Sequence, residues 1–382
     1  MKRSARTKKV LIFLLVVVAA IVLLGAILLR PIGPHLRALS LLLRFSNPKA
    51  QGFTASFAQH PFKEEDGSAQ TPRGLLRYRL YTPQDVKAPG GVVLLHGVHH
   101  LGMEDPRLWN LARALARAGV EVMTPELQDL ADYHVTARTI DVIGDSAVVL
   151  SKRMDRPVGV MGLSFAGGLS LLAAAKPEFA DKIGFVVAVG AHDDMDRVAR
   201  FFAANTITKP DGTEEPFHAH EYGVLVLAYS HLEDFFSPAD VPIAREAMRQ
   251  RLWEMPDPMK AAVGLSTAGH TELDQLFNHR EILEQALLQE IKLHKDEMDA
   301  VSPHGHLAQL HTAVFLLHGT GDTIIPSSET LWLSRDVPQN TLKSTLISPA
   351  LVHVDMGSEV TWQQQWQLVD FMAKVLDATE RL

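Results

Sequence analysis

The residues best suited to chemistry are Gly162-Leu163-Ser164-Phe165-Ala166, which separate an apolar run from a stretch rich in small residues. A nucleophile on a tight strand-to-helix turn needs small neighbours two positions to either side, because its backbone is strained and the chain folds closely against itself. Gly162 and Ala166 fill those positions, and the helix that follows directs its amide dipoles at the reaction centre. The segment therefore predicts Ser164 as a nucleophile. The alternative is a serine that only caps a helix.

A serine hydroxyl is a weak nucleophile at neutral pH unless a base takes its proton and an acid orients that base. Two candidates follow later apolar runs: Asp322 lies in the turn HGTGDTIIP, and His353 comes soon after the run TLKSTLIS. Each has an ordinary explanation, since aspartate is common in glycine-rich turns and the chain has 18 histidines. The order Ser, Asp, His after successive strands is much harder to obtain by chance. We therefore expect the three residues to act together.

Attack by a serine creates an oxyanion, which two N–H donors would stabilise. The buried run GVVLLHG leads into His96-Gly97-Val98, where the amide of Val98 could meet the oxyanion. The second donor would be the amide of Phe165, directly after the nucleophile. We expect His96 to be structural rather than catalytic. The histidines that follow at positions 99 and 100 face either the site or solvent.

The elements that must position these residues alternate between strands and helices. A βαβα order predicts a parallel sheet with helices on both faces. Before it, residues 53–60 and 75–81 predict a hairpin joined by the polar stretch KEEDGSAQTP. The apolar runs that predict buried strands are residues 91–97, 120–127, 157–164 and 182–190, with helices expected at 106–119, about 136–154 and after Ser164.

The alternation stops at about residue 191 and resumes at residue 312. The residues between these points are helical and mixed in polarity, so they predict an insertion that caps the core. After residue 319 we expect a helix near 327–336, a strand at 341–348 and a terminal helix from about Ser358.

The N-terminus has the pattern of a membrane anchor. Five basic side chains precede an uninterrupted apolar run from Val10 to Leu29, which Arg30 closes. Twenty residues rising about 1.5 Å each span about 30 Å, the thickness of a bilayer core. We expect an uncleaved signal anchor, because the run continues to Arg30-Pro31 without the polar step and small residues of a cleavage site. The excess of basic residues before the run predicts a cytoplasmic N-terminus and a catalytic body beyond the membrane.

Residues 35–45 predict a short amphipathic helix with Arg37 and Arg44 exposed, lying on the membrane or packed on the body. The predicted organisation is a basic leader (1–9), a transmembrane anchor (10–29), a juxtamembrane stalk (30–51), the first part of the core (52–190), a cap insertion (191–311) and the second part of the core (312–382).

Composition excludes several classes of function. The chain of 382 residues is 47% hydrophobic and 21% charged, as in a folded protein, and contains no cysteine. Disulfides, thiolate metal sites and cysteine nucleophiles are therefore absent. Beyond residue 44 the chain carries 29 basic against 44 acidic side chains, so nucleic acid is a poor partner. His218-x-His220 and His304-x-His306 have the spacing of metal ligands but no carboxylate pattern, and we expect neither a metal nor another cofactor.

These motifs resemble the α/β-hydrolase-fold serine hydrolases of the esterase and lipase superfamily, over about residues 75–190 and 312–382. That family places its lid between strands six and seven, where the insertion lies here. Two departures are Ala166 in place of the usual glycine and HGVHH in place of the HGGG-type loop. The resemblance implies Ser164 as nucleophile, Asp322 as acid, His353 as base, and the amides of Val98 and Phe165 as oxyanion donors. Asp193 and Asp194 follow strand six, where some members place the acid, and are the weaker alternatives.

The resemblance also implies a function: a membrane-anchored hydrolase that cleaves a carboxylic ester or thioester through an acyl-enzyme on Ser164. The expected partners are a small-molecule or lipid ester and, through the N-terminal helix, a membrane. The alternatives are a peptidase or acyltransferase with the same triad, or a non-catalytic binding module tethered to a membrane. Aromatic side chains of the insertion would line an acyl pocket or form the insertion's own core; they are Phe201, Phe202, Phe235, Phe236 and Trp253.

Overall fold

The computed structural model describes residues 32–87, 89–279, 282–352, 355–356 and 360–382. The predicted anchor at residues 10–29 and the predicted base His353 lie outside these ranges. Among the described helices, none combines the length and apolar character needed to cross a bilayer.

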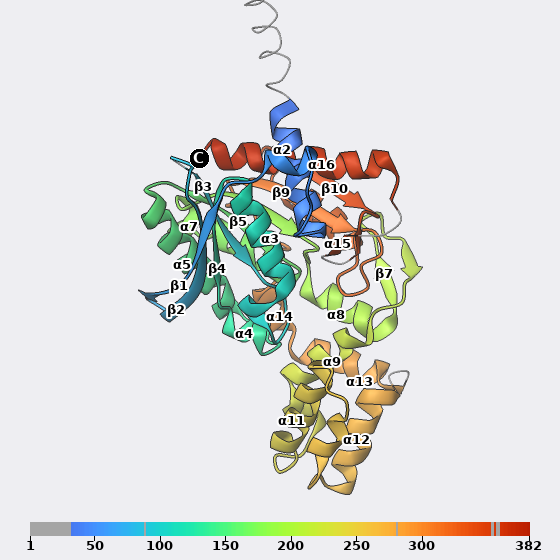
Figure 1. Ribbon diagram of the computed structural model, residues 1–382. Coiled ribbons are helices and arrows are strands. Elements are labelled where there is room, and N and C mark those ends of the chain that lie inside the picture. Colours follow the sequence, from blue (N-terminus) through green and yellow to red (C-terminus); the bar gives the residue numbers. More distant parts are fainter. Residues whose placement is uncertain (1–31, 88, 280–281, 353–354, 357–359) are drawn as a thin grey trace, which may run out of the picture.

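An eight-stranded sheet forms the centre of the molecule, in the order β1-β2-β4-β3-β5-β6-β9-β10 (Figure 1). The pairs β1–β2 and β2–β4 are antiparallel, and every other neighbouring pair is parallel, which confirms the predicted mostly parallel sheet. The strands are β1 (Phe62–Thr71), β2 (Gly74–Pro83), β3 (Gly90–Leu95), β4 (Val120–Pro125), β5 (Val158–Leu163), β6 (Ile183–Val189), β9 (Ala313–Gly319) and β10 (Leu342–Ser348).

Helices cover both faces of the sheet. Strands β3, β4 and β5 are buried along their whole length, as parallel strands between two helical layers must be. One layer consists of α2 (Ile32–Ser46), α3 (Pro106–Arg117) and α16 (Trp362–Glu380). The other includes α5 (Ala137–Met154), α6 (Phe165–Ala175), α7 (Pro177–Ala180) and α15 (Ser328–Asp336), with the short α4 (Gln128–Ala131) beside them. The order of the chain reverses at β3, which lies between β4 and β5, and ligand sites lie at the carboxyl ends of strands at such a point.

The predicted first strand is wrong. Residues Thr54–Phe57 form a short 3-10 helix, and the polar stretch expected to be a connection forms β1 instead. β1 pairs with β2 from Phe62 to Thr71 and lies at the edge of the sheet. Because most side chains of this edge strand are exposed, its sequence needs no apolar alternation and resembles a loop.

The amphipathic segment forms α2, which packs on the body against α3 and α16. Ala38 and Leu41 on its inner face are fully buried. The expectation that Arg44 is exposed is wrong, because it is only 9% exposed and its guanidinium donates to the carbonyl oxygen of Ala55. A buried guanidinium is tolerated when its hydrogen bonds are satisfied in this way. Arg37 donates to the carbonyl oxygen of Ala118 at 2.6 Å.

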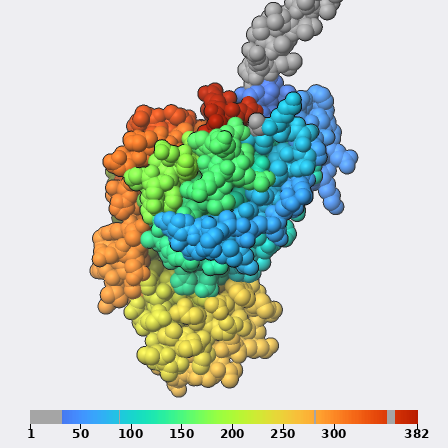
Figure 2. Space-filling view, turned by 90° about the vertical axis from the view of Figure 1, so that its left-hand side faces the viewer, coloured from blue at the N-terminus to red at the C-terminus, as the bar shows by residue number. Residues whose placement is uncertain are grey.

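The chain between β6 and β9 forms a series of helices with one small hairpin. Its outer helices project from the body on the side away from α2 and α16, and they form the lobe that is yellow in Figure 2. This segment is called the cap below. Its elements are α8 (Met195–Ala204), β7 (Thr206–Thr208), β8 (Glu214–Pro216), α9 (Glu221–Ser230), α10 (Leu232–Phe235), α11 (Val241–Leu252), α12 (Thr267–Asn278), α13 (Glu284–Leu293) and α14 (Lys295–Ala300).

The aromatic side chains of the cap have different surroundings. Phe201 and Phe236 are buried in the apolar core, and Phe235 packs against it. Phe202 is also buried and lines an apolar hollow between α8, α9 and α14. Trp253 is 41% exposed, and its ring lies 5.2 Å from that of His100. Most of these residues therefore belong to an apolar core that continues from the body into the cap, and Trp253 lies beside the loop that follows β3.

Candidate active site

Ser164 lies between the last residue of β5 and the first residue of α6, with φ +57° and ψ −133°. A residue other than glycine rarely has a positive φ, so the surrounding structure must enforce this backbone conformation. The amide of Ser164 donates to the carbonyl oxygen of Val189 at 2.7 Å, and the amide of Gly167 donates to that of Ser164 at 2.9 Å. A Cβ at Gly162 would lie 2.4 Å from the carbonyl oxygen of Ala166, so only glycine fits there. The predicted strained turn is present.

The loop after β3 lies directly against the serine. A Cβ at Gly97 would lie 3.0 Å from the Cβ of Ser164. His96 holds this loop, since its Nε2 accepts from the amide of Leu127 at 3.2 Å and its Nδ1 lies 2.8 Å from the carbonyl oxygen of Gly97. Burial lowers the pKa of His96 to about 4, so the ring is neutral and its Nδ1 carries the proton that it donates. His96 therefore has a structural part in the loop.

The predicted oxyanion donors belong to two segments next to the nucleophile, the loop after β3 and the start of α6. Phe165 begins α6, where backbone N–H groups have no acceptor within the helix. Val98 lines the same pocket as Ser164. The hydroxyl of Tyr222 in α9 donates to the carbonyl oxygen of Val98 at 2.8 Å, so the cap holds the loop that follows β3. Sequence analysis missed Tyr222, because it lies 124 positions from Val98 and belongs to no motif.

A small pocket that is partly open to solvent lies beside Ser164. His99, Asp105 and Arg107 supply most of its polar lining. Asp105 caps α3 by accepting from the amide of Arg107, and it also pairs with the guanidinium of that residue at 2.7 Å. His99 therefore faces the site, whereas the Nδ1 of His100 lies 3.2 Å from the hydroxyl of Tyr133.

Asp322 is held rigidly after β9. Its carboxylate Oδ1 accepts from the amides of Ile324 and Ile325 at 2.9 and 3.0 Å, and the residue is 1% exposed. Its Oδ2 lies 3.6 Å from the Nε2 of His318, which itself lies 2.8 Å from the carbonyl oxygen of Ile325. A Cβ at Gly190, at the end of β6, would lie 3.3 Å from Oδ2. The carboxylate therefore lies at the edge of the sheet where Ser164 lies.

Ser164 and Asp322 follow β5 and β9, which flank β6. Strands two places apart are separated by about 10 Å, a gap that one imidazole with two hydrogen bonds can bridge. The flanking segments β11 (Leu351–Val352) and β12 (Asp355–Met356) pair antiparallel. The loop that begins at Ser348 is joined to the acid loop, since Thr320 donates its amide to the carbonyl oxygen of Ser348 at 3.3 Å. His353 itself lies outside the described residues, so its role as base stays a prediction.

The alternative acids after β6 have other partners. Asp194 caps α8 by accepting from the amides of Asp196 and Arg197. Asp193 is fully buried and pairs with the guanidinium of Arg197 at 2.8 Å, while its amide donates to Glu329. Burial, with the nearby charge of Glu329, raises the pKa of Asp193 to about 7. Both aspartates therefore stabilise the start of α8.

The histidine pairs with metal-ligand spacing are used separately. His220 caps α9 by accepting from the amide of Tyr222 at 3.2 Å. His304 lies 2.5 Å from a carboxylate oxygen of Asp336, and His306 contacts the carbonyl oxygen of Ser302 at 3.2 Å. In the described part of the chain, the two histidines of His218-x-His220 and those of His304-x-His306 thus do not converge on a common metal site.

Comparison with known proteins leaves the family of this chain open. No family model and no curated protein matches it. The 2,6-dihydroxy-pseudo-oxynicotine hydrolase is similar in structure, with a TM-score of 0.47, 16% identity, and coverage of 85% of this chain and 71% of that one. The esterase of Pyrobaculum calidifontis has a TM-score of 0.44 and 12% identity, and each chain is covered over 92%.

A third similar structure is the acylaminoacyl peptidase of Pyrococcus horikoshii, with a TM-score of 0.46 and 11% identity. The match covers 84% of this chain and 42% of the peptidase. Similarity at this level carries no argument about function, so the assignment of the fold rests on the sheet and the strained turn. The strand order, with Ser164 on the turn after β5, is that of an α/β-hydrolase fold.

Proposed function

We propose that this protein is a serine hydrolase that cleaves a carboxylic ester or thioester through an acyl-enzyme on Ser164. The observation that carries the proposal is the backbone of Ser164, held at φ +57° beside a pocket and against Gly97. Strain of this kind costs about 1–3 kcal/mol and persists mainly at functional sites. A serine that merely capped α6 would need no such conformation, and Ser164 makes no capping hydrogen bond.

In the proposed reaction, Ser164 Oγ forms a bond to the acyl carbon while His353 takes the hydroxyl proton. The amides of Val98 and Phe165 stabilise the oxyanion, and Asp322 orients the imidazole. Collapse of the tetrahedral intermediate breaks the bond to the leaving alkoxide or thiolate, which receives the proton from His353. Water then attacks the acyl-enzyme by the same route, releasing the carboxylic acid and restoring the serine.

We further propose that residues 10–29 anchor the enzyme in a membrane, with a cytoplasmic N-terminus and the catalytic body on the other side. Exposed aromatic side chains near the start of α2 support this arrangement, since tryptophan favours the membrane interface. Trp362 is 75% exposed, and it stacks on Trp366, which in turn stacks on His35 of α2. The cap lies on the opposite side of the molecule from α2 (Figure 1). Such an orientation favours a substrate that reaches the site through water.

Labelling with a fluorophosphonate, which reacts with activated serines, tests the proposed chemistry. The full chain and its Ser164→Ala and Ser170→Ala variants are labelled, then assayed on p-nitrophenyl esters of increasing acyl length. Ser170 is the matched control, because it lies in α6 and its hydroxyl only donates to the carbonyl oxygen of Ala166. Labelling lost only in Ser164→Ala is expected. An unlabelled wild-type chain with a folded circular dichroism spectrum would instead indicate a non-catalytic module.

A further inference from the structure

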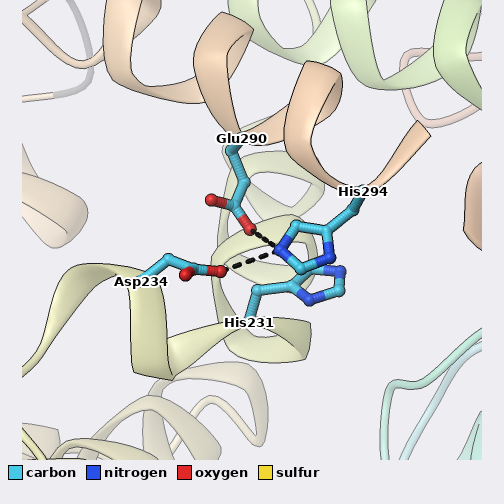
Figure 3. Close-up of side chains that lie close together, drawn as sticks. All are labelled: His231, Asp234, Glu290 and His294. Carbon is cyan, nitrogen blue, oxygen red and sulfur yellow. Dashed lines mark hydrogen bonds and ion pairs between the residues drawn. The ribbon is translucent and has the colours of Figure 1, made fainter.

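Four side chains with metal-binding atoms converge in the cap, far along the chain from the residues of the proposed reaction. They are His231, Asp234, Glu290 and His294, shown in Figure 3. One nitrogen or oxygen from each lies within 4.8 Å of the others. His231 directly follows α9 and Asp234 lies in α10, whereas Glu290 lies in the last turn of α13 and His294 directly follows that helix. The cluster therefore joins two segments of the cap that are about sixty positions apart.

Both carboxylates of the cluster point at the same nitrogen. The Nε2 of His294 lies 2.8 Å from Asp234 and 3.1 Å from Glu290, as the dashed lines in Figure 3 mark. A ring nitrogen carries at most one hydrogen, so it cannot satisfy two acceptors. Glu290 is 4% exposed, and its Oε1 is buried without a hydrogen bond to any described residue. A buried carboxylate oxygen aimed at a second carboxylate is unfavourable unless a proton or a cation lies between them.

The two imidazoles lie face to face beside these carboxylates. Their ring centroids are 3.5 Å apart, with an angle of 20° between the planes. Two imidazoles and two carboxylates at one place make a set of two nitrogen and two oxygen ligands.

We propose that His231, Asp234, Glu290 and His294 bind a divalent transition metal, with Zn²⁺ the best fit. Zinc takes imidazole and carboxylate ligands in tetrahedral geometry, whereas Mg²⁺ and Ca²⁺ prefer oxygen ligands alone. Neighbouring ligand atoms of a tetrahedral zinc site lie about 3.3 Å apart. The contacts of His294 at 2.8 and 3.1 Å are already close to this spacing, whereas the ring of His231, which stacks on that of His294, must rotate to direct a nitrogen at the metal.

The metal would tie α9 and α10 to α13. Figure 1 places α9 and α13 where the cap joins the body, with α11 and α12 farther out. His231 also lines the apolar hollow between α8, α9 and α14. Because α9 carries Tyr222, which binds the carbonyl oxygen of Val98, a metal here would fix the helix that reaches the loop after β3.

A second group of possible ligands, Asp193, His304 and Asp336, is a weaker candidate. The guanidinium of Arg197 already pairs with Asp193 at 2.8 Å and opposes a cation there. His304 therefore provides a matched control: a histidine beside carboxylates that is not expected to bind the metal.

The full chain, purified in detergent and stripped with a chelator, is titrated with Zn²⁺ by calorimetry, and bound metal is counted after gel filtration. We expect about one zinc per chain, a dissociation constant in the micromolar range or tighter, and a rise in Tm as zinc stabilises the folded state. Glu290→Gln and His294→Ala should each weaken binding by at least about tenfold, because the first removes the negative charge of a ligand and the second removes a ligand. His304→Ala and His270→Ala, an exposed residue of α12, should leave binding unchanged.

If His294→Ala does not fold, zinc binding by Glu290→Gln decides the test, because this variant keeps the shape of the side chain and removes only its charge. Co²⁺ bound to the wild type gives a further readout, since intense visible bands indicate a four-coordinate nitrogen and oxygen site. The proposal is overturned if the wild type binds no zinc, if Glu290→Gln binds it as tightly, or if the cobalt spectrum is that of an octahedral ion.

Discussion

Replacing Ser164 by glycine should leave the protein more stable than replacing it by alanine, although both variants lack the nucleophile. Alanine keeps a Cβ at φ +57° and therefore keeps the backbone strain of the wild type. Glycine removes the Cβ and relieves that strain. Because neither variant has a hydroxyl at this position, the comparison isolates the backbone from the chemistry.

The size of the effect follows from two opposing contributions. Relief of strain at this conformation is worth about 1–3 kcal/mol. The extra freedom of glycine in the unfolded chain costs about 0.5–1 kcal/mol. At the middle of both ranges, the net gain in the free energy of unfolding is thus about 1 kcal/mol. With an unfolding entropy of about 2.1 cal/mol/K per residue, a folded body of about 350 residues should gain about 1–3 °C in Tm.

Differential scanning calorimetry of the two variants measures this difference. Ser170 supplies the control, because it lies inside α6 with its hydroxyl bonded within the helix. At that position Ser170→Gly should be less stable than Ser170→Ala by about 1 kcal/mol, since glycine is unfavourable in a helix. The reasoning is refuted if Ser164→Gly is no more stable than Ser164→Ala while the control pair behaves as expected.

Three further variants test the site and its surroundings. Gly97→Ala should lower kcat strongly, because its Cβ would lie 3.0 Å from that of Ser164; an unchanged kcat in ester hydrolysis would contradict this. Tyr222→Phe should lower kcat about three- to tenfold with little change in KM, because it removes one hydrogen bond to Val98. A change in KM alone would argue against a role of Tyr222 in positioning. The pKa of Asp193 is raised from 3.8 to about 7, so the folded state holds this proton more tightly and loses stability as the pH rises from about 4 to 7. The Tm of Asp193→Asn minus that of the wild type should therefore increase over that interval, and a difference independent of pH would be evidence against an ionising Asp193.

The core could be predicted because its strands are buried on both faces. Such strands are continuous apolar runs, and β3, β5 and β9 each end at a short polar motif that marks the edge of the sheet. The turn at Ser164 could also be predicted from the sequence. Only glycine fits at position 162, so the residue type at that position reflects the constraint on the backbone. β1 was missed because an exposed edge strand needs no apolar pattern.

The contacts between cap and core were beyond prediction, since they join residues far apart in the sequence. Tyr222 lies in an apolar run, and nothing around it indicates that its hydroxyl reaches Val98. Its place depends on how α9 packs, which the composition of the helix does not specify because almost all its residues are buried. Side chains whose function arises from tertiary packing leave no local pattern to detect.

The metal cluster is different, because the sequence carries a local signal for it. A spacing of two, as in His304-x-His306, suits ligands on an extended strand. In helices, residues three or four positions apart share a face. His231 and Asp234 are three apart and Glu290 and His294 are four apart, so each pair presents two ligands on one side of its segment. Two such pairs, each on a helical stretch of an acidic and histidine-rich insertion, are the pattern from which this site could have been inferred.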